Sequence, residues 1–238
     1  KMIDAKKQYE KTKTKKLEYE IAKCNNMQMA KKIQLNSAYG ALGNQYFRFF
    51  DTKYAESITL SGQLSIKWME VKLNQFLNET LKTENEDYVV AVDTDSLYVV
   101  LDKVIEESGI NTDDTQKVID YLDKISNKIL EPYIEKSYKE LANYVSAFEQ
   151  KMVMKRENIA DKAIWTGKKH YIMNVYDSEG VRYEEPKLKM MGIESVRSST
   201  PGVVRKAIKE ALDVLMKDGE MALREYVNDF EKRFCQLP

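Results

Sequence analysis

Apolar and polar positions along the chain alternate between long stretches with helical periodicity and short β-rich runs. In residues 57–81 the apolar side chains recur every three or four positions, which predicts an amphipathic helix whose apolar face carries Ile66, Met69, Leu73 and Phe76. The runs "YVVAV" (88–92) and "LYVVL" (97–101) are short and rich in β-branched residues, so they predict two strands joined as a hairpin. Helical spacing returns in residues 113–130, at Val118, Leu122, Ile125 and Ile129.

The remaining segments extend this pattern in both directions. Residues 1–42 contain no proline and are rich in good helix formers, which predicts a short helix, a break at "KTKTKK" (11–16) and a longer helix ending at the capping residues Gly43 and Asn44. The aromatic stretch "QYFRFFD" (45–51) is expected to be extended. Pro132 begins a predicted helix that ends near Val145.

The last third of the chain predicts a second hairpin followed by helices. "KHYIMNVYD" (169–177) and "GVRYEEP" (180–186) are its strands, and the turn falls at "SEG". Thr200 and Pro201 form an N-cap and first-turn pair for a helix that Gly219 ends, and one more helix follows. The pattern indicates an α+β fold, with helices packed on an antiparallel sheet and helical extensions at both ends.

Composition narrows the class of protein without identifying a ligand. The 238 residues are 43% hydrophobic and 32% charged, as is typical of a globular protein. No apolar run approaches the roughly 20 residues that span a bilayer, so we expect no membrane association. Two cysteines near opposite ends, Cys24 and Cys235, predict a reducing compartment and no disulfide framework.

The net charge of zero conceals two basic segments. Residues 1–20 hold seven lysines against four acids, and residues 150–171 hold six basic residues against two acids. Either segment suits a polyanion, although solvated helix faces have the same composition.

Two carboxylates lie in the turn of the first predicted hairpin. Asp93 and Asp95 are two positions apart, which places them on the same side of an extended chain. Carboxylates held this closely repel each other unless a cation neutralises them, and such hard oxygen ligands favour Mg²⁺ or Mn²⁺. Asp-Thr-Asp-Ser is also ordinary turn chemistry. The apolar runs on either side favour the metal site, because they predict that the turn joins two buried strands. A solvent-facing loop would not need apolar strands before and after it.

A second candidate site lies in "KKIQLNSAYGALGN" (31–44). Lys32, Asn36, Tyr39 and Gly43 share one stripe of the predicted helix, and this stripe is polar or small where a core helix is apolar. A lysine suits binding of a phosphate, and an asparagine suits hydrogen bonds to a sugar or to the edge of a base. A tyrosine next to glycines suits the close approach of a base pair. The alternative is that Tyr39 is a half-buried core residue and the glycines only cap the helix.

The third candidate is "WTGKKHY" (165–171). Lys168 and Lys169 next to Tyr171 suit a nucleic-acid backbone, whereas the alternative is a charge pair at the edge of a strand. His170 is the only histidine and has no visible partner in the sequence, so we do not expect a metal ligand or a catalytic base there.

These stretches, in this order, resemble motifs of the family B DNA polymerases, particularly those of T-even-like bacteriophages. "KKIQLNSAYGALGN" is similar to the family's fingers motif, "VDTDSLYV" to its palm metal motif and "KKHY" to its Lys-Lys-Arg-Tyr motif, which contacts the primer strand. "LKMMGIESVRSSTP" (188–201) also resembles phage sequences where the palm passes into the thumb.

The resemblance implies three domains and a set of residue roles. Residues 1–43 are expected to form fingers helices, 44–186 the palm and 187–238 the start of the thumb. Asp95 would be a ligand shared by two Mg²⁺ ions, and Asp93 would lie beside them with a weaker part. Lys32 would hold the phosphates of the incoming deoxynucleoside triphosphate.

Further roles follow from the same motifs. Asn36 would lie near the phosphates or sugar of the nucleotide, Tyr39 would pack beneath the nascent base pair, and Gly40 would contact the DNA. Lys169 would reach the primer terminus of the primer-template DNA, while Lys168 and Tyr171 would hold its backbone. Glu157, in "KRENI", would match an auxiliary carboxylate near the metal site. His170 departs from the family's arginine, and a neutral imidazole carries no constant charge there.

The implied activity is DNA synthesis by two-metal phosphoryl transfer. The family's sites need another aspartate from an earlier palm motif, and "DTKYAES" (51–57) does not match that motif. We therefore expect the chain to be inactive alone, to need a partner polypeptide that carries the missing aspartate and the amino-terminal and exonuclease domains, and to work in the cytoplasm. The alternatives are a non-catalytic nucleic-acid-binding or assembly module, or a stand-alone phosphotransferase that uses Glu157.

Overall fold

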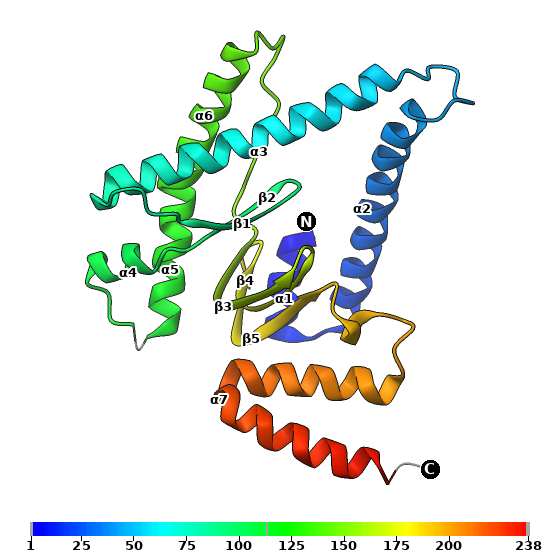
Figure 1. Cartoon of the computed structure of the whole chain (residues 1–238), viewed down its shortest axis with the longest axis vertical. Helices are drawn as coiled ribbons and strands as arrows, with labels where there is room; N and C mark the ends of the chain where they lie inside the picture. The colour runs from blue at the N-terminus through cyan, green and yellow to red at the C-terminus, as the bar shows by residue number, and fades with distance from the viewer. Residues whose placement is uncertain (1, 113, 237–238) are drawn as a thin grey trace. The chain divides into compact units, whose positions relative to one another are not determined.

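The computed structural model describes residues 2–112 and 114–236 and shows helices combined with two small antiparallel sheets (Figure 1). This confirms the α+β class. The helical elements are α1 (Met2–Thr12), α2 (Lys15–Leu42), α3 (Thr52–Leu81), α4 (Asp102–Ser108), α5 (Thr115–Ile125), the π turn η1 (Ser126–Leu130), α6 (Glu131–Tyr144), the 3₁₀ turn η2 (Glu194–Val196) and α7 (Gly202–Phe234). The strands are β1 (Val89–Asp93), β2 (Ser96–Val99), β3 (Asn158–Gly167), β4 (His170–Ser178) and β5 (Val181–Met191).

The chain divides into two compact units at Arg156 and Glu157, and each unit contains one sheet. The first contains the β1–β2 hairpin, and the second contains a three-stranded sheet in the order β3-β4-β5. These two units are defined by the compactness of the chain, whereas fingers, palm and thumb are functional domains. The predicted ranges of the three domains therefore stay predictions. No helix of the described residues is long and apolar enough to cross a membrane.

The core of the first unit lies between α3, α6 and one face of the hairpin. Met69 and Leu73 of the predicted apolar stripe pack with Val89, Ile134 and Tyr138, and Met69 is fully buried. The indole Nε1 of Trp68 donates to the carbonyl oxygen of Ser137 at 3.1 Å and joins α3 to α6. The apolar stripe predicted for residues 57–81 is therefore confirmed.

The helix α3 begins earlier than expected, at Thr52, because Asp51 caps it. The Asp51 carboxylate accepts the backbone N–H of Lys53 at 2.9 Å. The preceding aromatic stretch forms turns, so the expectation of extended chain was wrong. The Oδ1 atom of the Asn44 side chain accepts the N–H of Tyr46 at 3.0 Å, and the backbone carbonyl oxygen of Asn44 accepts the N–H of Phe47 at 2.9 Å.

The helices predicted at 113–130 and from Pro132 form one helical run, α5–η1–α6, and residue 113 lies outside the described part. Pro132 lies at the start of α6, directly after the π turn, where the missing N–H of proline is tolerated. The short helix α4 was not predicted, because seven residues give too little periodicity to detect.

In the second unit, β4 is the central strand and β5 an edge. Residues 171–175 of β4 are all buried, and the predicted hairpin of β4 and β5 is confirmed. Pro186 lies within β5, as an edge strand permits. The pattern did not predict β3, whose register with β4 shifts three times and so breaks a regular alternation.

The helix α7 packs on this sheet and folds back at Gly219 (Figure 1). Gly219 has φ 85° and ψ −171°, which confirms the predicted end of a helix there. The Nζ atom of Lys162 in β3 donates to the carbonyl oxygen of Met216 at 2.9 Å, in the last turn before Gly219. The N-cap is Pro201, one position later than the predicted Thr200.

Candidate active site

The two carboxylates lie at the tip of the β1–β2 hairpin. Asp93 pairs with Ser96, so Thr94 and Asp95 alone make the turn. The backbone N–H of Asp95 donates to the carbonyl oxygen of Asp93 at 2.6 Å, as in a γ-turn, and the central residue Thr94 has φ 53°. A β-branched residue rarely adopts positive φ, and such strain concentrates at functional sites.

Only one face of the hairpin is buried. Within β1, Val89 is 3% exposed and Ala91 is half-buried, whereas Val90 and Val92 are 50% and 39% exposed. The expectation that both apolar runs are buried was therefore wrong in part. Successive side chains of a strand point to opposite faces, and α3 and α6 cover only one face of the hairpin.

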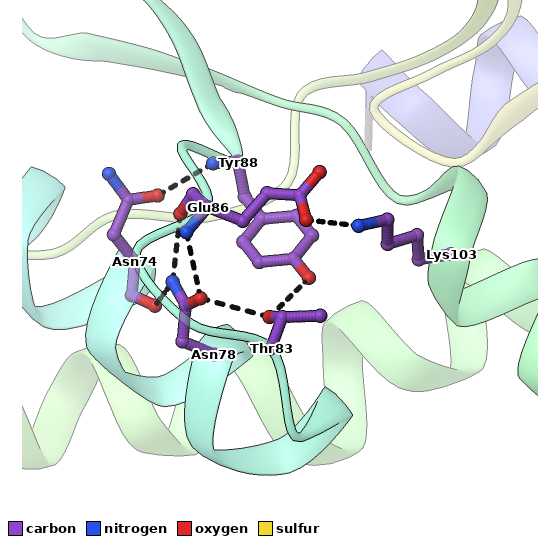
Figure 2. Close-up of polar contacts among 6 residues, drawn as sticks. All are labelled: Asn74, Asn78, Thr83, Glu86, Tyr88 and Lys103. Atoms are coloured by element: carbon purple, nitrogen blue, oxygen red, sulfur yellow. Dashed lines mark hydrogen bonds and ion pairs between the residues drawn. The ribbon is translucent and has the colours of Figure 1, made fainter.

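Two asparagines of α3 fix the position at which the first strand begins (Figure 2). The Oδ1 atom of Asn78 accepts the backbone N–H of Glu86 at 2.9 Å, and its Nδ2 atom donates to the carbonyl oxygen of Glu86 at 2.8 Å. The Oδ1 atom of Asn74 accepts the N–H of Tyr88 at 2.9 Å and that of Val89 at 3.1 Å. Side-chain amides here take the place of a neighbouring strand.

The same network continues to the next helix (Figure 2). The Thr83 hydroxyl donates to Oδ1 of Asn78 at 2.9 Å and lies 2.8 Å from the Tyr88 hydroxyl. Glu86 forms an ion pair with Lys103 of α4. The base of the hairpin is thus anchored on both sides, and its tip projects with the two acids.

The donor set at the tip fits a divalent cation. Asp93 is half-buried and Asp95 is exposed, and the Thr94 hydroxyl donates to Oδ1 of Asp93 at 3.0 Å. Carboxylate oxygens are the ligands that Mg²⁺ prefers. The described residues contain no cluster of three or more histidine, cysteine, aspartate or glutamate side chains suited to a metal ion.

The second stretch forms an exposed stripe on α2. Lys32, Asn36 and Tyr39 are all exposed, and no described side chain of this helix is buried. Tyr39 is 45% exposed and its hydroxyl lies 2.8 Å from Oγ1 of Thr59, which joins α2 to α3. Tyr39 is therefore not a core residue, and that part of the alternative is wrong, whereas Gly43 does cap α2, as the alternative expected. A Cβ atom at Gly40 would meet no atom within 4 Å, so that face of the helix is open.

The third stretch is the turn between β3 and β4. Gly167 pairs with His170, so Lys168 and Lys169 form a two-residue turn with both side chains exposed. Lys169 has φ 61°. Tyr171 is 4% exposed and belongs to the sheet core.

The sequence missed the partners of His170. Its Nε2 atom lies 3.2 Å from Nη2 of Arg197, and its Nδ1 atom lies 2.9 Å from the carbonyl oxygen of Lys168. Arg197 is 27 residues away along the chain, so no local pattern connects the two residues. Glu157 is exposed and forms an ion pair with Lys189 at 3.2 Å.

Comparison with known proteins decides the family. The model of DNA polymerase family B matches residues 1–237. This chain belongs to DNA polymerase family B. It is 41% identical to the "DNA-directed DNA polymerase" of Enterobacteria phage T4 over 222 residues, which are 90% of this chain and 25% of that protein. It is 42% identical to the enzyme of the same description from Escherichia phage RB69 over 219 residues, which are 88% of this chain and 24% of that protein.

The similarity confirms the resemblance to family B DNA polymerases of the T-even-like phage type, and it covers most of this chain. This chain spans about a quarter of the length of these two relatives. The acid-bearing hairpin and the Lys32 stripe belong to its first unit, and the Lys168–Lys169 turn belongs to the second.

Proposed function

We propose that the chain contributes to a DNA-directed DNA polymerase that adds deoxynucleotides to a primer. The observation that carries the proposal is the strained tip of the hairpin, where Asp93 and Asp95 are held across one residue in a chain of family B. Two relatives of which this chain covers a quarter are described as DNA-directed DNA polymerases.

In this proposal Asp95 and Asp93 hold divalent cations, with Mg²⁺ as the expected metal. Bound Mg²⁺ would activate the primer 3′-hydroxyl and neutralise the charge of the triphosphate. Asp95, at the exposed apex of the turn, is the principal ligand. Asp93 is half-buried and bonded to Thr94, so its part is the weaker one.

The exposed stripe of α2 binds the nucleotide. The Lys32 ammonium neutralises phosphate charge, Asn36 lies one turn further along and offers an amide to the phosphates or sugar, and Tyr39 packs against the nascent base pair. Gly40 presents no side chain, so DNA can approach the backbone there. In the second unit, Lys169 reaches the primer terminus and Lys168 binds the primer backbone. Tyr171 was expected to hold the backbone as well, but it is 4% exposed, so it supports the turn from the sheet core.

We further propose that the complete site needs another metal-binding aspartate from polypeptide outside this sequence. Two carboxylates at one turn leave most positions around a six-coordinate cation to other ligands. The source would be further family B sequence, carried on the same polypeptide or on a partner.

Primer extension tests the proposal. The full chain, mixed with a polypeptide that carries the missing family B segments, is expected to extend a labelled primer-template in the presence of Mg²⁺, and the chain alone is expected to do nothing. Asp95→Asn should abolish extension, whereas Asp218→Asn, which neutralises an exposed carboxylate of α7, should leave it unchanged. Extension by the chain alone would contradict the need for another aspartate. Full activity of Asp95→Asn would contradict catalysis by the hairpin and favour a non-catalytic nucleic-acid-binding module.

A further inference from the structure

The imidazole of His170 connects the lysine-bearing turn to Arg197. A guanidinium group can only donate hydrogen bonds, so the 3.2 Å contact makes Nε2 of His170 the acceptor. The proton of the neutral ring is then on Nδ1, which donates to the carbonyl oxygen of Lys168 at 2.9 Å. One side chain therefore fixes both the backbone of the turn and the orientation of Arg197.

The chain next to Arg197 lies directly against the same turn. Gly192 has φ +71°, and a Cβ atom added there would lie 2.2 Å from the carbonyl oxygen of Lys169 and 2.8 Å from Cδ2 of His170. Contacts this short do not occur, so any other residue at position 192 must displace the turn. Gly192 and Arg197 thus hold the turn at two points.

Three positively charged side chains lie in the turn and in the segment that faces it. Lys168 and Lys169 directly precede His170 in sequence, and Arg197 faces it from the segment after β5. Glu194 is the nearby acid, with its Oε1 atom 3.6 Å from Nη1 of Arg197, and its side chain is 58% exposed. Three cations gathered at one turn repel each other, and a polyanion relieves this repulsion.

We propose that Gly192, His170 and Arg197 form a latch that positions Lys168 and Lys169 for a phosphodiester backbone. This inference rests on the proposed function, and it makes the three latch residues positioning residues. Two lysines held in one arrangement lose less freedom on binding than lysines on a mobile turn, and each side chain that must be immobilised weakens binding severalfold. In the "KKHY" stretch, His170 stands where the similar family motif has arginine. In the latch, Arg197 supplies the constant positive charge beside this histidine.

DNA binding by the full chain tests the latch through variants that leave both lysines in place. In fluorescence anisotropy with a labelled primer-template, Gly192→Ala and Arg197→Met are expected to weaken binding about fivefold to tenfold. Arg197→Lys, which keeps the donor and the charge, should bind nearly as the unmodified chain does. The matched controls are Gly109→Ala, which has the same strain at φ +66° but open space around the new Cβ, and Arg224→Met, which removes an exposed arginine paired with Glu220. Both controls should bind normally.

The salt dependence separates positioning from direct contact. A positioning role leaves the slope of log K against log salt unchanged in Gly192→Ala and Arg197→Met, because both lysines still reach phosphates. A slope that falls by about 0.9 in Arg197→Met alone, together with full affinity in Gly192→Ala, would make Arg197 a direct phosphate ligand and overturn the latch.

A spectroscopic test does not depend on DNA. His170 is the only histidine, so ¹⁵N NMR gives a single imidazole whose protonated nitrogen can be assigned. The expected neutral form carries its proton on Nδ1, and Arg197→Met should change this spectrum whereas Arg224→Met should not. A proton on Nε2, or a spectrum indifferent to Arg197→Met, overturns the latch even if DNA binds. If the unmodified chain binds no DNA, the proposed function fails, while the spectrum still decides whether the latch exists.

Discussion

The backbone N–H of Asp95 donates to the carbonyl oxygen of Asp93 at 2.6 Å, so the two acids are held on either side of Thr94, which has φ 53°. The strain lies in the backbone of the residue between the carboxylates, and the base of the hairpin is anchored by Asn74 and Asn78. The turn therefore keeps its shape only because the structure below it is fixed.

Replacing Thr94 with glycine is expected to stabilise the fold and to impair the site. Relief of left-handed strain is worth about 1–2 kcal/mol, and the greater freedom of glycine in the unfolded chain removes about 0.5–1 kcal/mol of this gain. The free energy of unfolding, measured in urea, should therefore rise by up to about 1.5 kcal/mol. Primer extension in the complemented system should fall, because the two carboxylates lose their fixed spacing.

Lys82→Gly is the matched control for this change. Lys82 has φ 52° at the end of α3, far along the chain from the turn, so its replacement should stabilise without loss of extension. A drop in unfolding free energy above about 1 kcal/mol in Thr94→Gly would show that the threonine is not strained.

Lys32 and Lys31 give a test of the nucleotide-binding stripe. Both side chains are exposed on α2, but consecutive residues of a helix point about 100° apart, so only Lys32 shares the face of Asn36 and Tyr39. Loss of one charge-assisted hydrogen bond to phosphate costs about 1.5–3 kcal/mol, so Lys32→Met should raise the KM for deoxynucleoside triphosphate roughly 10- to 150-fold.

Lys31→Met should change this KM little, and neither variant should change the unfolding free energy, because no described side chain of α2 is buried. Equal effects of the two lysines on KM would indicate a diffuse electrostatic attraction in place of a site.

The sequence predicted those parts of the fold and site that depend on local pattern. The stripe of Met69 and Leu73, the acid-bearing turn and the helix end at Gly219 all follow from spacing within a few residues. Proline and glycine marked ends of elements because their backbone limits are local.

The features of the fold and site that the sequence did not predict depend on contacts between residues far apart along the chain. The partner of His170 is 27 residues away, and the strand β3 is defined by its irregular pairing with β4 and not by its own alternation. Val90 and Val92 are as apolar as Val89, yet only the fold decides which face of the hairpin is covered. The aromatic stretch forms turns in which the Asn44 side chain accepts a backbone N–H. The expectation of extended chain was based on the aromatic residues and did not consider this asparagine.

Asn78 is expected to be one of the most sensitive polar residues of the first unit. Asn78→Ala leaves the N–H and the carbonyl of Glu86 without their side-chain partner and removes one of the two partners of the Thr83 hydroxyl, so urea unfolding should show a loss of about 2–4 kcal/mol. Asn127→Ala removes an exposed amide that, among the described residues, bonds to Asp123 in the preceding turn and to no other residue, and it should cost less than about 1 kcal/mol. Equal losses in the two variants would show that the network of Figure 2 adds nothing to stability.

The ion pair between Lys72 of α3 and Glu140 of α6 predicts a pH-dependent contribution to stability. Their Nζ and Oε2 atoms are 2.8 Å apart, and the hydrogen bond from Lys72 lowers the pKa of the Glu140 carboxyl below its ordinary value. A carboxyl whose pKa is lower in the folded state binds protons more readily when unfolded. Its stabilising contribution is therefore complete above the ordinary glutamate pKa and is lost as the pH falls through the lowered folded value.

Urea unfolding of the unmodified chain and of Glu140→Gln across the acid range measures this contribution. The difference in unfolding free energy should be largest near neutral pH and should shrink towards zero in acid, because a protonated Glu140 and a glutamine are then nearly equivalent. Glu56→Gln is the control, since it removes an exposed carboxylate of α3 for which the described residues provide no ion pair. If the difference between Glu140→Gln and the unmodified chain stays constant with pH, the pair between α3 and α6 contributes through packing, and its charge contributes nothing.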